Sequence, residues 1–415
     1  MYSLYSFLYL LGFIFFYLPR ELFKKRKKKP LNWLKEKLGF IKPPSFEEKK
    51  PAIWIHAVSV GEVLAIATLI KRLTQNYNIV LTTITETGRL VAKNRFNGLP
   101  VEVYYLPLDL KGPLLTFLKR IKPKALLITE TEIWPNLIKV VSEKIPVALI
   151  NGRISERSYK GYRLFKFLFQ PLLNKLKFLA VQEEIYAERF RKIGVNSEKI
   201  KVVGNLKFEL SIPERDFPEL KDLPRPIIVA GSTHPTEEEI ILQCFLEALD
   251  KGSLIIVPRH PERFKEVEDL IKRRIREEIE FFRYSQIKGS SKIFGKRLIL
   301  LFDEMGLLAS LYKICDLAII GGSFIPHGGQ NPLEAIYWKK PVITGPYMSN
   351  FPFVADFVKE GALLQVPSES LKGALKILIE NKELAQNMAE RAYQIFQSKK
   401  GALEKTLTLI KENLL

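Results

Sequence analysis

Short apolar runs alternate with amphipathic stretches along most of the chain. The first run, at 52–58, is followed by a helix-like stretch at 63–73. Further runs in the first half lie at 79–84, 125–129, 147–151, 178–181 and 201–203. A second series lies at 227–230, 254–257, 279–282, 298–301, 317–320 and 342–344. Continuous apolar strands separated by helices are typical of a parallel sheet covered on both faces. The pattern therefore predicts two doubly wound α/β domains.

The segment from Ser211 to Pro226 interrupts this alternation with several prolines among charged residues, which is typical of a linker. We therefore predict an anchor with a basic flank at 1–29 and a Rossmann-like domain at 30–212. A linker at 213–226 and a second Rossmann-like domain at 227–415 complete the chain. Ligands of such sheets bind beyond the carboxyl ends of the strands. Two such domains that face each other are expected to enclose a cleft between those ends.

The first 18 residues carry no charge and eight aromatic side chains. As a helix they span ~27 Å, close to the thickness of a bilayer core. A basic run from Lys24 to Lys29 follows and, by the positive-inside rule, stays in the cytoplasm. A cleaved signal peptide would need a basic start and a small-residue cleavage site, and neither is present. We expect a single spanning anchor with its short N-terminus outward, and an interfacial helix is the alternative.

The net charge of +20 predicts an anionic partner. No zinc-finger spacing or interleaved Arg-aromatic signature accompanies this charge, so nucleic acid is not the expected partner. An anionic membrane surface and an acidic substrate are favoured. Part of the charge, as at 265–280, is also typical of a solvated surface rich in Lys and Glu. The two cysteines cannot build a disulfide framework and fit a reducing compartment.

Candidate catalytic residues in the first half follow predicted strands. Glu62 opens a helix after a Gly turn, where the helix dipole should keep it ionised and able to accept a proton from a sugar hydroxyl. Position alone favours a helix-capping glutamate, which is common. Glu130 and Glu132 come directly after the next apolar run, with Trp134 beside them, a set that suits sugar handling or a solvated loop. Lys207, close to the predicted linker, is a candidate cation or an ordinary surface lysine.

Arginines and glycines at strand ends suggest anion binding. Arg153 follows the run at 147–151 and is able to hold a phosphate or carboxylate, or to pair locally with a glutamate. In the second half, Gly231 and Ser232 suggest an anion-binding turn. The other candidates there are Pro258, Arg259, His260, Asp303, Glu304, Met305, Gly306, Asn331, Pro332, Leu333 and Glu334. Together they predict one nucleotide site along the strand ends of one domain.

Other kinds of site are disfavoured. The four histidines and two cysteines lie at no metal-ligand spacing, and no Asp-x-Asp pair is present, so we expect no metal site. The chain lacks the Gly-x-Ser-x-Gly motif that presents a nucleophilic serine, and it lacks a Walker-A loop. These absences disfavour a serine hydrolase and an NTPase.

The strand-end motifs, taken in order, resemble the Kdo (3-deoxy-D-manno-octulosonic acid) transferases of lipopolysaccharide biosynthesis. The resemblance covers nearly the whole chain. It is carried by the segments at 56–62, 129–136, 151–158, 204–208, 258–263 and 331–334. It implies a GT-B fold and an inverting transfer of Kdo from CMP-Kdo to a lipid A precursor (lipid IVA) at the inner membrane, without a metal or other cofactor.

The resemblance also implies residue roles. Glu62 is implied as the general base, and Glu132 and Lys207 as the pair that supports the transition state. The implied CMP site consists of Pro258, Arg259, Met305, Gly306, Leu307, Asn331, Pro332, Leu333 and Glu334. Two positions depart from the family pattern: Gln330 stands where His is expected, and Leu307 stands where Glu is expected. Gln330 keeps hydrogen-bonding ability without charge, and at Leu307 only a backbone contact survives.

Two other functions fit parts of the sequence. The first is another GT-B glycosyltransferase that uses a UDP-sugar. The second is a non-catalytic membrane protein that binds anionic lipid through its lysine run. The addition of one, two or more Kdo residues is compatible with the sequence.

Overall fold

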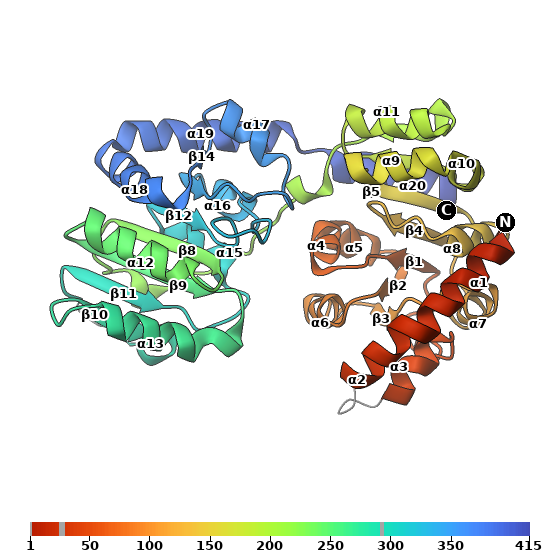
Figure 1. The fold of residues 1–415 in the computed structure, drawn as a ribbon, viewed down its shortest axis with the longest axis horizontal. Coiled ribbons are helices and arrows are strands. Elements are labelled where there is room, and N and C mark those ends of the chain that lie inside the picture. Colours follow the sequence, from red (N-terminus) through yellow and green to blue (C-terminus); the bar gives the residue numbers. More distant parts are fainter. Residues whose placement is uncertain (1, 25–29, 291–293) are drawn as a thin grey trace. The chain divides into compact units, whose positions relative to one another are not determined.

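Two parallel β-sheets, each of seven strands among the described residues, form the centres of two units (Figure 1). The computed structural model describes residues 2–24, 30–290 and 294–415. The first unit runs up to Glu209 and includes Lys399–Leu415, and the second comprises Leu210–Ser398. The prediction of two parallel α/β domains is confirmed.

In the first unit the strand order is β3-β2-β1-β4-β5-β6-β7. The chain first builds outward from β1 to β3 and then returns to the other side of β1, so the order reverses between β1 and β4. Such a reversal is where open α/β sheets bind ligands. The strands are β1 (Ala52–His56), β2 (Asn78–Thr83), β3 (Val101–Tyr105), β4 (Ala125–Thr129), β5 (Val147–Gly152), β6 (Leu179–Val181) and β7 (Ile200–Val202).

Helices cover both faces of this sheet because alternate side chains of each buried strand point to opposite faces. One core lies under α7, α8, α10 and α11, and the other under α4, α5, α6 and α20. The helices are α1 (Tyr2–Gly12), α2 (Leu18–Lys24), α3 (Pro30–Lys37), α4 (Val60–Ala65), α5 (Ala67–Leu73), α6 (Glu86–Arg95), α7 (Lys111–Ile121), α8 (Pro135–Ser142), α9 (Glu156–Leu164), α10 (Lys166–Leu173), α11 (Glu184–Ile193) and α20 (Ala402–Leu414).

In the second unit the strand order is β10-β11-β9-β8-β12-β13-β14, with the reversal between β8 and β12. The strands are β8 (Ile227–Thr233), β9 (Gly252–Pro258), β10 (Glu280–Arg283), β11 (Arg297–Leu301), β12 (Leu317–Ile320), β13 (Val342–Thr344) and β14 (Leu364–Gln365). The helices are α12 (Glu237–Ala248), α13 (Phe264–Arg274), α14 (Tyr284–Ile287), α15 (Leu308–Leu311), α16 (Leu333–Tyr337), α17 (Val354–Lys359), α18 (Leu371–Glu380) and α19 (Lys382–Ser398).

The apolar pattern of the sequence did not predict two of the strands, β3 and β14. β3 lies at the edge of its sheet, where Val101 and Glu102 are only half-buried, so its apolar run is interrupted. β14 has two residues, which is too short to produce a periodic signal. Both occupy sheet edges, where one side of the strand needs no apolar cover.

The predicted second domain, 227–415, is wrong at its C-terminal end. The last helix, α20, belongs to the first unit. Its apolar positions at three- and four-residue spacing, including Leu407 and Ile410, join the core beneath β1. The carboxylate of Glu209 accepts hydrogen bonds from the N–H groups of Gly401 (2.7 Å) and Leu403 (3.2 Å) at the start of the helix. Complementary apolar faces, which chain order does not encode, decide where α20 packs.

The predicted linker, 213–226, packs on the second unit. Phe217 is buried against the rings of Tyr284 and Phe302, and Leu220 is buried as well. Lys313 pairs with acidic side chains of the segment, Glu214 among them, at 3.3 Å. The prolines therefore mark irregular backbone, while the apolar residues between them hold it against a core.

The N-terminal segment forms one continuous helical stretch, α1, a π-helical turn at Phe13–Tyr17, and α2. Its part Tyr2–Glu21 is long and apolar enough to cross a membrane, by length and composition only. The predicted basic flank falls largely on residues 25–29, which lie outside the described residues.

Replacing Ile410 by Ala should destabilise the first unit. Ile410 is fully buried in the core that α20 shares with β1. Removing such a side chain leaves a cavity and costs ~2–4 kcal/mol. Because two units need not unfold together, hydrogen exchange resolved by peptide is the suitable measurement. Faster exchange is expected in β1 and α5 and not in the second unit.

Ile377→Ala is the matched control, because Ile377 lies on α18 and is 54% exposed. Equal destabilisation by the two substitutions would contradict the placement of α20.

Candidate active site

Glu62 lies in the first turn of α4, directly after β1. Ser59 is the N-cap of this helix, and its hydroxyl donates to Glu62 Oε1 (3.0 Å). Glu62 Oε2 accepts from the Val58 N–H (2.9 Å) and lies 3.0 Å from the Thr129 hydroxyl at the end of β4. Each carboxylate oxygen has two acceptor positions. Among contacts with described residues, Oε1 therefore keeps one acceptor position.

The hydroxyl of Thr129 links β1 to the carboxylate. It lies 2.8 Å from the carbonyl oxygen of His56 and 3.0 Å from Glu62 Oε2, and it has only one proton to donate. The hydroxyl donates to Glu62 when the carboxylate is ionised. When Glu62 is protonated, the acid proton can bond to Thr129, which then donates to His56. The hydroxyl is therefore compatible with both protonation states.

Burial raises the pKa of Glu62 above its ordinary value, the Val58 N–H opposes the rise, and the charge of Glu130 adds to it. The expectation that the helix dipole keeps Glu62 ionised therefore omitted the larger effect. Removal from water penalises the charged form by more than one helix end compensates. Glu62 is a base of increased proton affinity, and it also makes the capping contacts of α4.

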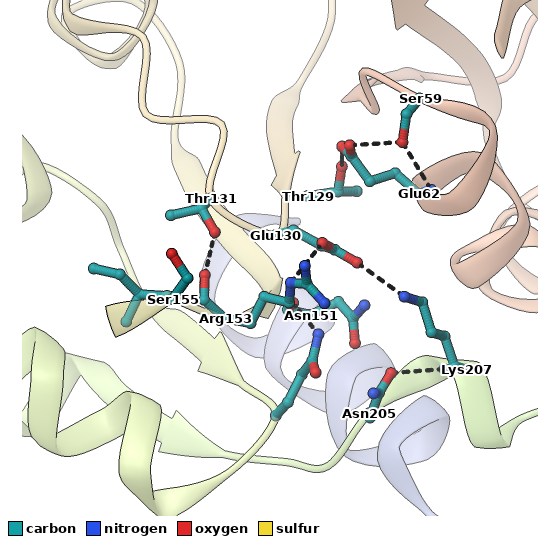
Figure 2. Close-up of polar contacts among 12 residues, drawn as sticks. Ser59, Glu62, Thr129, Glu130, Thr131, Asn151, Arg153, Ser155, Asn205 and Lys207 are labelled. Atoms are coloured by element: carbon teal, nitrogen blue, oxygen red, sulfur yellow. Dashed lines mark hydrogen bonds and ion pairs between the residues drawn. The ribbon is translucent and has the colours of Figure 1, made fainter. Parts of the chain in front are cut away.

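Glu130 is the electrostatic centre of the site. Its carboxylate pairs with Arg153 Nε (3.1 Å) and with Lys207 Nζ (3.6 Å), and Figure 2 shows it between the two cations. Its backbone φ is +50°, a left-handed conformation that costs energy in a residue with a Cβ. Asn151, at the end of β5, has the same φ and accepts the N–H of Leu206 (3.0 Å). This bond positions the 3-10 turn that carries Lys207.

Glu132 is the third carboxylate of the site and lies in the same loop as Glu130. Trp134 Nε1 donates to its Oε2 at 2.9 Å. Burial raises the pKa of Glu132 to about 7, and the nearby charge of Glu62 contributes. Burial and the charge of Glu132 also raise the pKa of Tyr162 to about 12. Near neutral pH, Glu132 is thus divided between its ionised and neutral forms.

The structure brings Glu62, Glu132 and Lys207 together at the carboxyl ends of β1, β4 and β7 in one unit. This is the edge of the sheet at which the strand order reverses. His56 lies beneath it, fully buried, with its pKa lowered to about 3 by burial. Its imidazole is therefore neutral and supports the floor of the site.

The residues predicted to bind a nucleotide lie at strand ends of the second sheet. Pro258 ends β9, and the Arg259 N–H donates to the Thr233 carbonyl (3.0 Å) at the end of β8. Met305, Gly306 and Leu307 follow β11, with Met305 49% exposed. Asn331, Pro332, Leu333 and Glu334 lead into α16, where Asn331 Oδ1 accepts the Leu333 N–H at 3.1 Å.

The neighbouring arginine, Arg263, is held by two acidic side chains. Its guanidinium pairs with Glu238 (2.6 Å) and Glu266 (2.9 Å). Both arginines act electrostatically on His234. The two carboxylates already neutralise Arg263, which favours Arg259 over Arg263 as a ligand for an anion.

A buried carboxylate of the protein lies beside the predicted anion-binding turn at Gly231 and Ser232. Glu237 is fully buried and accepts N–H groups from His234 (3.0 Å), Gly322 (2.6 Å), Ser323 (3.0 Å) and Phe324 (2.9 Å). One of these donors, His234, directly follows β8, and the other three lie in the loop after β12. The carboxylate ties the loop after β12 to the turn after β8.

Three of the four histidines gather beside this loop. The ring centroids of His234 and His327 are 4.0 Å apart, and His260 lies 5.6 Å from His234. Burial, followed by the charges of the other two histidines, lowers the pKa of His234 to about 4. Its Nε2 lies 3.1 Å from Gln330 Nε2. A neutral His234 accepts from the Gln330 amide, which explains how an uncharged residue is accommodated at that position.

No group of three or more His, Cys, Asp or Glu side chains within 2–24, 30–290 and 294–415 is arranged to hold a metal ion.

Sequence reasoning named the acidic pair after β4 but gave the central position to Glu132 alone. Glu130 carries both cation contacts, and the only sequence signal for this was its place directly after the strand. Glu237 was missed entirely. An acidic residue in the first turn of a helix is common, and its four backbone partners come from segments about 85 residues apart.

Two family models match the chain. Residues 32–210 match the model described as 3-Deoxy-D-manno-octulosonic-acid transferase (kdotransferase). Residues 292–395 match the model of glycosyl transferases group 1.

Two relatives that match the chain over most of their own length carry the same description. The 3-deoxy-D-manno-octulosonic acid transferase of Haemophilus influenzae is 37% identical over 397 residues, which cover 92% of this chain and 91% of the relative. The protein of that description from Chlamydia trachomatis serovar A is 30% identical over 90% of this chain and 88% of its own length.

Solved structures at low identity support the fold. The UDP-GlcNAc 2-epimerase of Neisseria meningitidis covers 87% of this chain and all of its own, with a TM-score of 0.57 and 15% identity. Anabaena HepE in complex with UDP and glucose gives a TM-score of 0.52 at 14% identity, over 87% of this chain and 99% of its own. Two parallel α/β units of this kind constitute the GT-B type. With full-length relatives at up to 37% identity, the chain belongs to the 3-deoxy-D-manno-octulosonic acid (Kdo) transferase family.

Proposed function

We propose that this enzyme transfers Kdo from CMP-Kdo to a lipid A precursor, with inversion at C2 of Kdo. The observation that carries the proposal is the full-length similarity to a Kdo transferase. The carboxylate cluster at the ends of β1 and β4 supplies the chemistry that such a transfer needs. Lipid IVA is the proposed acceptor.

Glu62 is the proposed general base. Its Oε1 takes the proton of the acceptor hydroxyl while the hydroxyl oxygen forms a bond to C2 of Kdo. The bond between C2 and the phosphate oxygen breaks, and CMP leaves with the electron pair. Hydrogen bonds to Glu62 from three groups fix its direction, and its raised pKa increases its affinity for the proton.

Glu132 and Lys207 are proposed to support the transition state. An ionised Glu132 favours positive charge developing on the sugar ring during cleavage of the donor. Lys207 and Arg153 together balance Glu130, so the site holds three carboxylates without an excess of repulsion.

The proposed CMP site consists of strand-end residues of the second unit: Pro258, Arg259, Met305, Gly306, Leu307, Asn331, Pro332, Leu333 and Glu334. Arg259 and nearby backbone N–H groups would balance the charge of the leaving phosphate. Met305 to Leu307 offer backbone contacts, since Leu307 has no polar side chain. Transfer is proposed to need no metal or other cofactor.

The lipid acceptor implies work at a membrane. The apolar N-terminal helix is weak evidence for membrane association, and the basic run that follows it favours the cytoplasmic face. We place the enzyme at the inner membrane, with both units on the cytoplasmic side.

Incubation of the purified protein with CMP-Kdo and lipid IVA, followed by mass measurement of the lipid, tests the proposal. Products heavier by whole Kdo residues are expected, in the presence and absence of EDTA, and their masses give the number added. Transfer from a UDP-sugar, or binding of UMP in preference to CMP, would favour the rival glycosyltransferase. Lipid binding without turnover or CMP affinity would favour a non-catalytic membrane protein.

Replacing Glu62 by Gln should lower the rate of transfer ~10²–10⁴-fold, the usual contribution of a general base. CMP affinity should stay unchanged, because the proposed nucleotide site lies in the other unit. Enzyme kinetics and calorimetric titration with CMP measure the two quantities. Glu86→Gln is the control, since Glu86 is exposed in the first turn of α6. Full turnover by the Glu62→Gln enzyme would show that Glu62 is not the general base.

Glu132 should give both activity and stability a dependence on pH. Since its pKa rises from 4.5 to about 7 on folding, the folded state holds the proton more tightly than the unfolded state. The associated stabilisation is present below pH ~4.5 and is lost as the pH rises to ~7. Glu132→Gln should therefore be more stable than the parent by ~3 kcal/mol above pH 7, and similar at pH 4.5.

The transfer rate of the parent should rise through pH ~7 as Glu132 ionises, and the Glu132→Gln enzyme should be slower and lack this rise. Denaturant titrations and rate profiles across pH 4.5–8.5 provide the measurements. Glu143→Gln, at the exposed end of α8, is the control. A variant whose stability and rate keep the parent's pH dependence would refute both expectations.

Replacing Glu237 by Gln should weaken CMP binding at least tenfold and lower stability by ~2–4 kcal/mol. The amide nitrogen would meet backbone N–H groups that now donate to a carboxylate oxygen. Calorimetry and thermal unfolding measure the two effects. Glu239→Gln, two residues along α12 and partly exposed, is the control and should leave CMP binding unchanged. Unchanged CMP affinity in Glu237→Gln would separate this carboxylate from the nucleotide site.

A further inference from the structure

The N-terminal helical stretch, formed by α1 and the π-helical turn at Phe13–Tyr17, has two distinct sides. One side, with Tyr5, Ser6 and Tyr9, is half-buried against the first unit, and Phe13 is buried beyond it. The other side is apolar and open to solvent. Its exposed side chains are Leu4 (62%), Phe7 (57%), Leu8 (57%), Ile14 (43%), Phe15 (67%) and Phe16 (79%).

Polar contacts fasten the first half of α1 to the start of α8. The Tyr5 hydroxyl donates to Asp109 Oδ2 at 2.8 Å, and Asn136 Nδ2 donates to Ser6 Oγ at 2.9 Å. Asp109 is 1% exposed and also accepts the N–H groups of Asn136 (3.1 Å) and Leu137 (2.6 Å). One buried carboxylate therefore caps α8 and holds α1.

Contacts continue to both ends of the helical stretch. Near its start, the Tyr2 hydroxyl lies 3.4 Å from the carbonyl oxygen of Leu168 in α10. Beyond its last turn, the rings of Phe13 and Tyr17 lie 6.4 and 6.2 Å from that of Trp33 in α3. Figure 1 shows α1 running along the first unit toward α3. A helix that crossed a bilayer would carry its first turn ~30 Å from a body outside the membrane, and these contacts could not form.

A second apolar cluster adjoins the start of α1. It consists of Leu164 (74% exposed), Phe165 (48%) and Phe167 (64%), where α9 meets α10. Exposed basic side chains lie on the same two helices: Arg157, Lys160 and Arg163 on α9, and Lys166 on α10. Exposed apolar side chains accompanied by cations fit the boundary of an anionic bilayer, in which the aromatic rings enter the acyl region and the cations meet phosphates.

The charge pattern favours a bilayer over a second copy of the chain. Two copies that paired through this surface would bring their exposed basic side chains together, in a protein with a net charge of +20, and these charges would repel. Anionic lipid headgroups neutralise the same charges. The density of aromatic residues in α1 is also typical of the membrane interface.

The docked helix reaches the candidate active site. Tyr9 packs edge-on against Trp134, with ring centroids 6.4 Å apart, and Trp134 donates to Glu132. Through Tyr5 and Ser6, α1 also holds the start of α8, directly after the Glu132 loop. Tyr9 and Trp134 therefore link the membrane-facing helix to the position of Glu132.

We propose that α1 lies along the membrane surface without crossing it, with the cluster at 164–167 as a second point of insertion. The docked helix positions the Glu132 loop beside the lipid from which the acceptor comes. This last step rests on the proposed function, whereas the mode of membrane binding rests on the contacts of α1 alone. Of the two alternatives that the sequence left open, the structure assigns the interfacial one.

Topology distinguishes a helix that lies in the interface from one that spans. A protease-cleavable tag before residue 1 of the full-length protein, in sealed inverted membrane vesicles, should be cleaved from outside, because the N-terminus stays on the cytoplasmic side. Protection of the tag until detergent is added would overturn the proposal. This outcome does not depend on transferase activity.

Binding to vesicles of phosphatidylethanolamine and phosphatidylglycerol tests the surface itself. The substitutions Phe15→Ser with Phe16→Ser, and Phe165→Ser with Phe167→Ser, should each lower co-sedimentation at least fivefold. Matched substitutions of exposed apolar residues in the second unit, Ile377→Ser with Leu384→Ser, should not change it. Equal binding by all variants would refute the surface. If the protein binds membranes through these residues but transfers no Kdo, the proposed function is contradicted and the proposed mode of membrane binding still holds.

Replacing Tyr9 by Ala tests the link to Glu132. The turnover number should fall severalfold while CMP affinity and vesicle binding stay unchanged, and the rise of rate through pH ~7 should shift, because Trp134 loses its support. An unaltered pH profile would show that α1 anchors the enzyme without positioning the loop.

Discussion

Three carboxylates crowd the carboxyl ends of β1 and β4, and the chemistry of the site depends on how their mutual repulsion is managed. Glu130 is neutralised by Arg153 and Lys207, which come from the ends of β5 and β7. Glu62 and Glu132 receive hydrogen bonds, and burial raises the pKa of both. One carboxylate is thus paired with two cations, and the other two have an increased affinity for a proton, which is what a general base needs.

In the second unit, a buried carboxylate holds a glycine-rich loop in place. A loop rich in glycine has many backbone N–H groups and little side-chain packing to hold it. Glu237 gathers three of those N–H groups and one from the turn after β8. A buried carboxylate is stable there because four donors replace its water. The loop beside Asn331 thereby acquires a defined shape.

Asp109 plays a comparable part for the N-terminal helix. It caps α8 and accepts the hydroxyl of Tyr5, so α1 is fastened to the element that follows the Glu132 loop. Buried carboxylates with several donors thus recur at the start of α4, at the glycine-rich loop and at the N-terminal helix. In each place one side chain joins segments that are distant in sequence.

The sequence by itself determined the two parallel α/β units, because buried strands need unbroken apolar runs whatever their partners are. It also determined Glu62, Glu132 and Lys207 as candidates, since ligand-binding residues of such sheets follow strands. Tertiary structure alone decided that Glu130 is paired with two cations and that Glu237 accepts four backbone N–H groups. It also decided that α20 returns to the first unit and that α1 lies along it. Each of these depends on contacts between residues tens to hundreds of positions apart, and local periodicity carries no information about such distances.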